Sequence, residues 1–273
     1  MTALEVINLN KTYPSFTLDC VNFSVEEGRI LGLVGANGAG KSTTIKGILG
    51  LIAAEGEAKI FSFHSKSAEA KPLYGYAGGG FRNYPHKKIG AIARVVSGFY
   101  PTWSEEKFKR YTEKFELMPE KKVSELSEGM KVKFALALAL SHGAKLLVLD
   151  EPTSGLDPLA REQFLDILLS LVKEEGVSVL FSTHIVSDLE RVADDVVLLS
   201  HGRVLVNEPL ETLKSKYLLA SFADKPAENV IGLKAVKHGY EGLVFRTESL
   251  DGATLKEPTL EEVIIHLERG SGV

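Results

Sequence analysis

The 273-residue sequence predicts an α/β fold with a mostly parallel β-sheet. From residue 146 to residue 200, short apolar runs alternate with segments of helical periodicity, a pattern typical of strand–helix–strand units. Earlier in the chain, a near-continuous apolar run at residues 29–34 is followed at once by a glycine-rich turn. Such runs suit strands that are buried on both faces, as the strands of a parallel sheet are.

The composition is that of a globular protein with a packed core: 44% of the residues are hydrophobic, 25% are charged and 8% are aromatic. These values disfavour the disordered, collagen-like and disulfide-stapled classes, and Cys20 is the only cysteine. The net charge of −4 lacks the strongly basic footprint of a dedicated nucleic-acid binder, so no nucleic-acid partner is expected.

Apolar runs in the sequence are too short to span a bilayer. The longest runs from Phe134 to Leu140, whereas a spanning helix needs about 20 residues. The first residues lack a basic segment followed by an apolar one, so no secretory signal is expected. A single cysteine suits a reducing compartment. We therefore expect a cytoplasmic chain.

The first 50 residues predict strands and one helix. Residues 4–25 read as antiparallel strands, because short mixed apolar runs flank turn residues at 13–15. The run at 29–34 predicts a buried strand. Residues 42–49 predict a helix, because apolar residues recur there at helical spacing and Gly50 is a suitable residue to end it.

Residues 73–144 predict a helical insertion between two parts of the α/β core. Residues 85–117 read as two helices, the second capped by Ser104, and a further helix is expected from Glu128 to His142. The insertion carries 12 lysines and arginines against 7 glutamates and no aspartate, a net charge of +5. This charge suits contact with anionic headgroups at a membrane, or else a solvated face, which the alternation of Glu and Lys favours.

After this insertion the α/β alternation resumes. The sequence predicts strands at 146–150, 177–182 and 196–200, helices at 159–175 and 187–193, and a hairpin through His201 and Gly202. Beyond about residue 215 the pattern weakens, although Thr259 and Glu262 form a capping box before a short amphipathic helix. Residues 215–273 are therefore expected to form a small accessory region.

The glycine-rich turn after the buried strand matches the pattern G-x-x-x-x-G-K-S. Its residues are Gly35, Ala36, Asn37, Gly38, Ala39, Gly40, Lys41 and Ser42. Glycines let the backbone curl so that its N–H groups, and the N-terminus of the following helix, face an anionic phosphate. Lys41 adds a positive charge at the β- and γ-phosphates, and the Ser42 hydroxyl is a suitable ligand for Mg²⁺. A purely structural glycine-rich turn is the alternative, but the flanking strand and helix favour phosphate binding.

Two carboxylates end the apolar strand predicted at residues 146–150. Asp150 and Glu151 would lie at the C-terminal edge of the sheet, where α/β proteins bind their ligands. Beside a phosphate-binding turn, Asp150 suits the coordination shell of a Mg²⁺ ion and Glu151 suits the polarisation of an attacking water. Taken alone, two acidic residues after a strand commonly do no more than solvate its edge.

His184 and Ser127 are the remaining candidates from spacing. His184 follows the strand predicted at 177–182, so a parallel arrangement brings it to the same edge, within reach of a γ-phosphate; the alternative is an ordinary surface histidine. Ser127 precedes an apolar helix whose N-terminal N–H groups could face a phosphate. Spacing alone favours a helix cap at Ser127 and nothing more.

Across about residues 4–210, these motifs in this order resemble the ATP-binding subunits of ABC transporters. Gly35 to Thr43 looks like the Walker A motif, 146–151 like Walker B, 126–130 like the signature motif, 154–157 with Asp157 like the D-loop, and His184 like the switch histidine. The resemblance implies the ABC ATPase fold: a P-loop NTPase core with a mostly parallel sheet, an N-terminal antiparallel β subdomain and an inserted α-helical subdomain.

The same resemblance divides the chain into an ATP-binding domain and a C-terminal region. The domain covers residues 1–214, with its core at 1–72 and 145–214 and its helical subdomain at 73–144. Residues 215–273 form the accessory region.

Four residues matter for comparison with the family pattern. Tyr13 occupies the place of the aromatic residue that stacks on adenine, and a buried core tyrosine is the alternative. Ser127 and Gly129 stand in an L-S-x-G-M form that resembles a bacterial subgroup, and they retain the implied contact with γ-phosphate in a second subunit. Gly79 stands where the Q-loop glutamine is usual, so Asn83 or a backbone carbonyl would have to take its role toward Mg²⁺.

The resemblance implies an ATP-hydrolysing subunit that couples energy to transport. It would dimerise with a second ATP-binding subunit, identical or different, around two ATP with Mg²⁺, and drive a separately encoded transmembrane permease from the inner face of the cell membrane. One alternative is an ABC-type ATPase acting on ribosomes or DNA, which the single P-loop and the lack of sustained heptads disfavour. Another is a regulatory nucleotide-binding module with weak hydrolysis, motivated by Gly79 and the altered signature.

Overall fold

A six-stranded sheet forms the centre of the computed structural model, which describes residues 1–78, 81, 83–226, 230–247 and 252–271. Its strand order is β10-β9-β3-β8-β7-β6. The strands are β3 (Ile30–Val34), β6 (Tyr74–Gly78), β7 (Leu146–Asp150), β8 (Ser178–Thr183), β9 (Asp195–Ser200) and β10 (Arg203–Pro209). All neighbours from β9 across to β6 pair in parallel, and only β10 is antiparallel to its neighbour. The predicted mostly parallel sheet is confirmed.

The central strands are apolar throughout because both of their faces are covered. In β7, Leu147 and Leu149 belong to the hydrophobic cluster that contains the helices of one face. Leu146 and Val148 belong to a second cluster, on the other face. Successive side chains of a strand point to opposite faces, and the side chains on both faces of β7 are fully buried. The first polar residue of this strand is therefore its last, Asp150.

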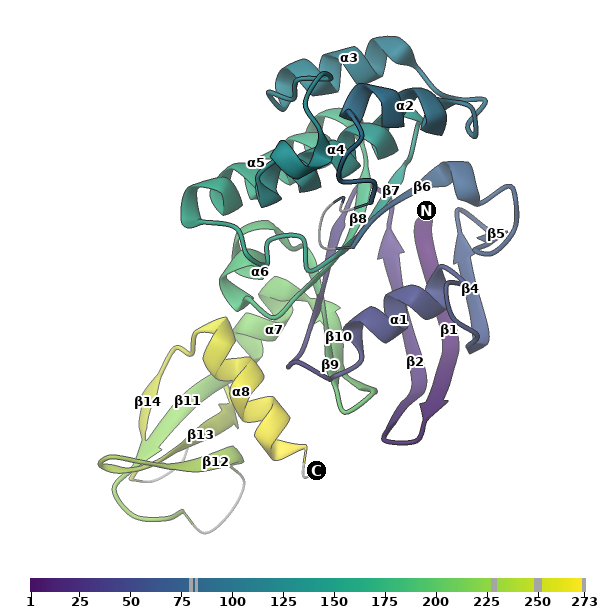
Figure 1. Cartoon of the computed structure of the whole chain (residues 1–273). Helices are drawn as coiled ribbons and strands as arrows, with labels where there is room; N and C mark the ends of the chain where they lie inside the picture. The colour runs from purple at the N-terminus through teal and green to yellow at the C-terminus, as the bar shows by residue number, and fades with distance from the viewer. Residues whose placement is uncertain (79–80, 82, 227–229, 248–251, 272–273) are drawn as a thin grey trace.

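A smaller antiparallel sheet covers the second face. It has the order β2-β1-β4-β5 and consists of β1 (Thr2–Tyr13), β2 (Phe16–Glu26), β4 (Glu55–Ile60) and β5 (Phe63–His64). Helix α1 (Lys41–Ile48) contacts β1 and β2 on one side and β7 on the other, so it is packed between the two sheets (Figure 1). The predicted antiparallel N-terminal subdomain is confirmed.

Helices cover the first face and rise above it. Helices α4 (Glu128–Ser141), α5 (Pro158–Glu175) and α6 (Val186–Val192) pack there, and α2 (Ile89–Ser97) and α3 (Glu105–Lys114) lie above α4 at the top of Figure 1. Short 3-10 turns occur at Lys71–Leu73 and Val123–Glu125. The Ser104 hydroxyl accepts a hydrogen bond from the Lys107 N–H at 3.2 Å, so the predicted cap is present. No helix in the described part of the chain combines the length and apolar character that crossing a bilayer requires.

Strand β6 lies inside the stretch expected to be the helical subdomain, yet it pairs in parallel with β7 at the edge of the central sheet. Gly75 allows this close packing, because a Cβ atom at that position would lie 2.2 Å from the Cβ of Ala139 in α4. Residues 74–78 therefore extend the core sheet beyond the expected boundary at residue 73. The division of the chain into subdomains itself stays a prediction.

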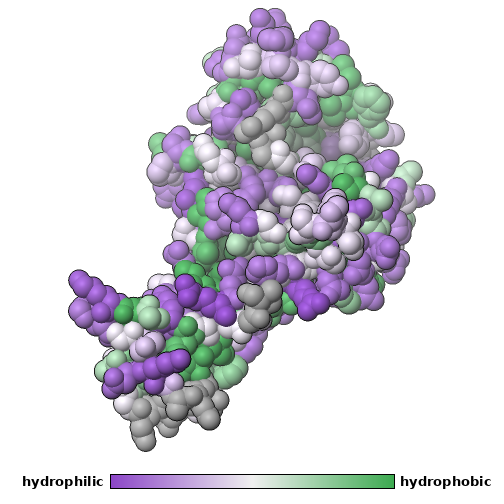
Figure 2. Space-filling model, turned by 60° about the horizontal axis from the view of Figure 1, so that its bottom comes forward, coloured by the Kyte–Doolittle hydropathy of each residue, from purple (hydrophilic) through white to green (hydrophobic). Residues whose placement is uncertain are grey.

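The C-terminal region folds into a four-stranded sheet and a helix. After α7 (Leu210–Lys216) come β11 (Tyr217–Phe222), β12 (Ile231–Val236), β13 (Gly239–Phe245), β14 (Thr254–Lys256) and α8 (Leu260–Gly270), with the sheet order β12-β13-β11-β14. The predicted capping box is present: Thr259 Oγ1 accepts from the Glu262 N–H at 3.2 Å, and Glu262 Oε2 accepts from the Thr259 N–H at 2.8 Å. Figure 2 shows the region as a lobe that projects from the larger body.

This lobe shares its hydrophobic core with the larger body. Leu213, Tyr217 and Val263 belong to the same buried cluster as α5 and α6. Helix α8 contacts α6, and the Leu260 N–H donates to Glu190 Oε1 at 3.4 Å. The C-terminal sheet is thus attached through the helix that follows His184.

Candidate functional site

The glycine-rich turn leaves β3 at the middle of the central sheet and enters α1. Gly35 packs so closely against β9 that a Cβ atom there would lie 2.1 Å from the Leu199 carbonyl oxygen. Gly40 has a left-handed backbone (φ 112°), and its Cβ would meet the Phe16 ring at 2.8 Å. The Ala39 carbonyl accepts from the Gly202 N–H at 3.0 Å. Glycine is therefore required at both ends of the turn by the packing of this chain itself.

Lys41, the first residue of α1, is buried within the turn, with 5% of its surface exposed. Its Nζ donates to the carbonyl oxygens of Gly35 at 2.7 Å and Ala36 at 3.2 Å, and lies 3.3 Å from Glu151 Oε1. An ammonium group has three donors, and each has an acceptor here. The positive charge is consequently held at the mouth of the turn.

The buried Asp150 carboxylate joins α1 to two strands. Ser42 Oγ donates to Asp150 Oδ1 at 3.0 Å, and Ser182 Oγ, from the end of β8, donates to the same oxygen at 2.8 Å. Tyr76 on the adjacent β6 has its pKa raised, chiefly by burial and secondarily by the negative charge of Asp150. The parallel pairing of β6, β7 and β8 accounts for this proximity, because their carboxyl ends meet at one edge.

Glu151 lies one residue further, between Lys41 and His184. Its Oε2 is 2.6 Å from His184 Nδ1, and its Oε1 is the atom that pairs with Lys41. Its backbone is left-handed (φ 51°), which costs a non-glycine residue about 1 kcal/mol or more. The unusual turn directs the Glu151 side chain across the strand ends rather than away from them.

These side chains line one cavity of about 690 Å³. It is lined by Ser15, Phe16, Asn37, Gly38, Gly40, Lys41, Ser42, Thr43, Glu151, Ser154 and His184. A cavity of this size fits a nucleotide-sized ligand. Most of the residues predicted for phosphate binding and hydrolysis are thus brought together, although they come from segments far apart in the chain.

Among the described residues, seven of the predicted site residues do not line this cavity. Three of them, Gly35, Ala39 and Asp150, belong to the turn and the strand end described above, and four others remain. Tyr13 ends β1 with 37% of its surface exposed, and the Lys11 ammonium lies 5.1 Å from its ring centre. Ser127 and Asp157 are exposed N-caps of α4 and α5: Ser127 accepts from the Met130 N–H at 3.2 Å, and Asp157 from the Ala160 N–H at 2.9 Å.

Gly129 is the fourth, in the first turn of α4. Its Cβ would meet only ordinary contacts, the closest at 3.6 Å, so packing within this chain does not explain a glycine there. The predicted Q-loop position, Gly79, lies outside the described residues. Asn83, the candidate substitute, is exposed.

The sequence interpretation missed Ser182, Phe16, Ser15 and Ser154. Ser182 carried a weak signal, because it is a polar residue at the end of an apolar strand, two positions before His184. Phe16, on β2, pairs with Tyr13, on β1, across the turn between these strands. The sequence predicted an aromatic residue beside the nucleotide, but it predicted Tyr13 and not Phe16.

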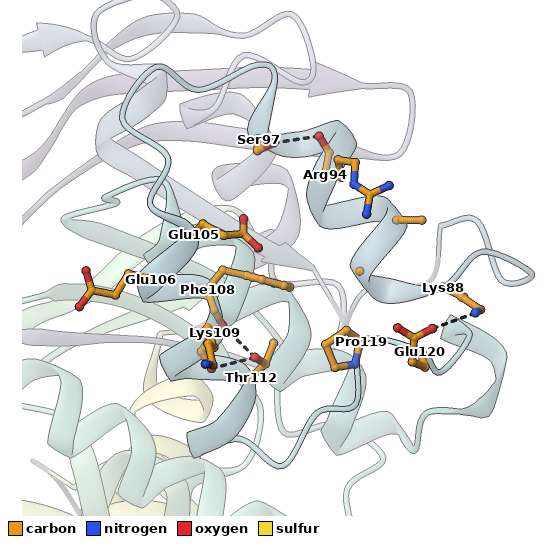
Figure 3. Close-up of a pocket in the computed structure, with 12 residues that line it drawn as sticks. Lys88, Arg94, Ser97, Glu105, Glu106, Phe108, Lys109, Thr112, Pro119 and Glu120 are labelled. Atoms are coloured by element: carbon orange, nitrogen blue, oxygen red, sulfur yellow. Dashed lines mark hydrogen bonds and ion pairs between the residues drawn. The ribbon is translucent and has the colours of Figure 1, made fainter.

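A second cavity, of about 840 Å³, lies in the helical insertion between α2 and α3 (Figure 3). Its charged lining is mixed: Lys88, Arg94, Lys109, Glu105, Glu106 and Glu120. Lys88 and Glu120 neutralise each other in an ion pair of 2.8 Å. None of the predicted site residues lines it, and its balanced charges do not favour a phosphate.

Fold and site together define a P-loop nucleotide-binding protein. The family described as ABC transporter matches residues 18–154. A probable multidrug ABC transporter ATP-binding protein of Escherichia coli (strain K12), YbhF, is 36% identical over 224 residues, which are 79% of this chain; the chain spans 38% of that relative. The bacitracin transport ATP-binding protein BcrA of Bacillus licheniformis is 32% identical over 247 residues, 82% of this chain and 76% of the relative.

Solved structures agree with these relatives. The structure of an ATP-binding subunit of an ABC transporter superposes with a TM-score of 0.69 at 31% identity, over 78% of this chain and 92% of that one. The chain therefore belongs to the ATP-binding proteins of the ABC transporter family. The family resemblance and the fold class expected from the sequence are both confirmed.

Proposed function

We propose that this chain is the ATP-hydrolysing, energy-coupling subunit of an ABC transporter. The observation that carries the proposal is the cavity at the strand ends, where a phosphate-binding turn, Lys41, the Ser42–Asp150 pair and the Glu151–His184 pair meet. Family membership supports it, because the relatives described above are named as transport ATP-binding proteins.

The proposal includes a separate permease and a place at the membrane. Residues 1–214 would be the ATP-binding domain and 215–273 the accessory region. The chain would bind a separately encoded transmembrane permease, peripherally on the inner face of the cell membrane. Two relatives are named for multidrug and bacitracin transport, and these names describe those proteins.

ATP would bind with its phosphates in the turn. The N–H groups at the start of α1 and the Lys41 ammonium face the β- and γ-phosphates. Lys41 must then exchange its contact with Glu151 for phosphate oxygens, which releases the carboxylate. Phe16 and Ser15 border the same cavity. Tyr13 is exposed enough to offer its ring to adenine.

The chemistry of Ser42 and Asp150 fits Mg²⁺, because a hydroxyl and a carboxylate supply the oxygen ligands that this ion prefers. The described residues contain no cluster of three His, Cys, Asp or Glu side chains that could hold a metal, so phosphate oxygens would complete its shell. The bound ion would neutralise charge on the transferring phosphoryl group.

Glu151 and His184 would act on the attacking water. Glu151 Oε1, once Lys41 has left it, accepts a proton from the water as the water attacks the γ-phosphorus, and the bond to the β-phosphate oxygen breaks to give ADP and phosphate. The 2.6 Å contact with His184 holds this carboxylate at the strand ends. General-base assistance of this kind is worth about 10²–10⁴-fold in rate.

A second subunit would supply the signature segment. Ser127 and Gly129 lie away from this chain's own cavity, and packing within the chain does not require a glycine at position 129. Asp157 is likewise exposed at the start of α5. These positions suit contact with the γ-phosphate of ATP held by a facing subunit, identical or different, as the resemblance implies.

Glu151→Gln tests the proposal. The amide keeps the shape and removes the base, so phosphate release should fall by at least about 100-fold while ATP affinity by calorimetry stays unchanged. With ATP and Mg²⁺, the variant should elute as a dimer in size-exclusion chromatography. Glu162→Gln, at an exposed position of α5, is the matched control and should behave like the wild type.

Two results would contradict the proposal. Absence of steady turnover by the purified wild type would favour the regulatory nucleotide-binding alternative. Unchanged turnover in Glu151→Gln would remove the assignment of the general base.

A further inference from the structure

Ser182 joins the two carboxylates of the site through a single hydroxyl. Its Oγ donates to Asp150 Oδ1 at 2.8 Å and accepts from the Glu151 N–H at 3.1 Å. The hydroxyl is fully buried at the end of β8, directly beside the end of β7. One side chain thus contacts the proposed metal ligand and the backbone of the proposed general base.

The hydrogen bond to Asp150 orients that carboxylate. Both Ser42 and Ser182 donate to Oδ1, and Oδ2 accepts no hydrogen bond from the described residues. A hydroxyl has one hydrogen and two lone pairs, so Ser42 can ligate a metal ion through its oxygen and still donate to Asp150. Ser182 is the second donor to the same oxygen, and it holds the carboxylate from the neighbouring strand rather than from the phosphate-binding turn.

The hydrogen bond from Glu151 supports a strained backbone. The Glu151 N–H is shared between the carbonyl oxygen and the hydroxyl of Ser182, both at 3.1 Å. Glu151 adopts a left-handed conformation that a non-glycine residue rarely adopts without support from its surroundings. The Ser182 hydroxyl therefore also contributes to the direction in which the Glu151 side chain leaves the strand.

We propose that Ser182 is a positioning residue that couples the geometry of Asp150 to that of Glu151, an inference that rests on the proposed function. Ser182 itself does not line the cavity, so it would act through these two residues. Groups that orient metal-binding carboxylates in this way typically contribute 10–100-fold to metal affinity or activity. A residue that merely stabilised β8 would change neither the affinity for Mg²⁺ nor the turnover rate by such a factor.

The same strand provides a matched control. Ser178, at the other end of β8, is also fully buried, and its Oγ also accepts a backbone N–H, that of Gly28 at 3.0 Å. Its contacts lie at the opposite edge of the sheet from the carboxylates. Ser178→Ala and Ser182→Ala therefore remove the same atom from the same strand and differ in what that atom touches.

The first measurement is the gain in affinity that Mg²⁺ gives to a non-hydrolysable ATP analogue, by calorimetry with EDTA and then with Mg²⁺. We expect all three proteins to bind the analogue equally in EDTA. Mg²⁺ should raise the affinity of wild type and Ser178→Ala by the same factor, and that of Ser182→Ala by a factor about tenfold smaller. The second measurement is turnover, with kcat of Ser182→Ala reduced about 10–100-fold and that of Ser178→Ala within about threefold of wild type.

Equal behaviour of the two serine variants in both measurements would overturn the inference. If Ser182→Ala does not fold, Ser182→Cys takes its place with the same expectations, because a thiol fills similar space but is a weak hydrogen-bonding group. Ser182→Thr, which retains the hydroxyl, should recover the Mg²⁺ effect. A wild type without turnover would contradict the proposed function, whereas the Mg²⁺ titration would still decide the role of Ser182.

Discussion

Asp188 is a buried carboxylate whose replacement has a calculable effect on stability. It lies on α6 with 1% of its surface exposed. Its Oδ2 accepts from Thr153 Oγ1 at 2.7 Å, and its Oδ1 accepts from Arg161 Nε on α5. The contact ties the segment that follows Glu151 to the helix that follows His184.

Asp188→Asn keeps the shape but removes the negative charge that pairs with Arg161, while the Thr153 hydroxyl can accept a hydrogen bond from the new NH₂ group. Removing one partner of a fully buried ion pair costs about 3–5 kcal/mol. The Arg161 side chain is 27% exposed, and water therefore replaces part of its interaction. We expect a loss of about 2–3 kcal/mol. At about 2–4 °C per kcal/mol, the melting temperature should fall by roughly 4–12 °C.

Thermal unfolding followed by circular dichroism measures this change, with Asp166→Asn as the control. Asp166 on α5 pairs with Arg191 on α6 at 2.7 Å, so it joins the same two helices, but it is 60% exposed. An exposed pair contributes about 0.5 kcal/mol, or roughly 1–2 °C. Equal shifts for the two variants, or a shift below about 2 °C for Asp188→Asn, would refute the reasoning.

Two further predictions concern the phosphate-binding turn and the buried histidines. Gly35→Ala should lower the free energy of unfolding by about 3 kcal/mol, because its Cβ would lie 2.1 Å from the Leu199 carbonyl oxygen. Gly38→Ala should lower it by about 1–2 kcal/mol, because the space there is open but φ is 88°. Urea titrations measure both costs, and equal costs would contradict the packing argument. Burial lowers the pKa of His142 and of His266, so the unfolded chain binds more protons. The free energy of unfolding should therefore be highest above about pH 6.5, the pKa of an unfolded histidine, and should decrease as the pH falls below that value. In a variant with both histidines replaced by Gln, the melting temperature should fall less between pH 8 and pH 5 than it does in the wild type. An unchanged pH profile in that variant would exclude these two groups as its source.

The inner strands of the central sheet, β3, β7, β8 and β9, were the most predictable part of the fold. β7 has the bounds expected from its apolar run, because burial on both faces leaves no polar residue before Asp150. The C-terminal sheet was not predicted, since β12 and β13 mix glycine, charged and apolar residues and their register is irregular. β6 was missed for a related reason: two glycines and two tyrosines give it no apolar run.

The candidate site was predictable wherever topology alone brings residues together. Asp150, Glu151 and His184 end neighbouring parallel strands, so their order in the chain and the rule that strand ends meet were sufficient. Ser182 was not, because the hydrogen bonds of one buried hydroxyl depend on the register between β7 and β8. Phe16 was not predictable either, because the conformation of the β1–β2 turn decides on which face of the hairpin its ring lies.

The left-handed backbone at Glu151 sets stability and activity against each other. Glycine at that position would relieve the conformational cost of about 1 kcal/mol or more, so the replacement that relaxes the fold is also one that deletes the carboxylate. Selection for thermal resistance alone would tend to remove the side chain on which turnover is proposed to depend. Engineering for heat tolerance should therefore leave this residue unchanged and seek gains in parts of the molecule remote from the strand ends.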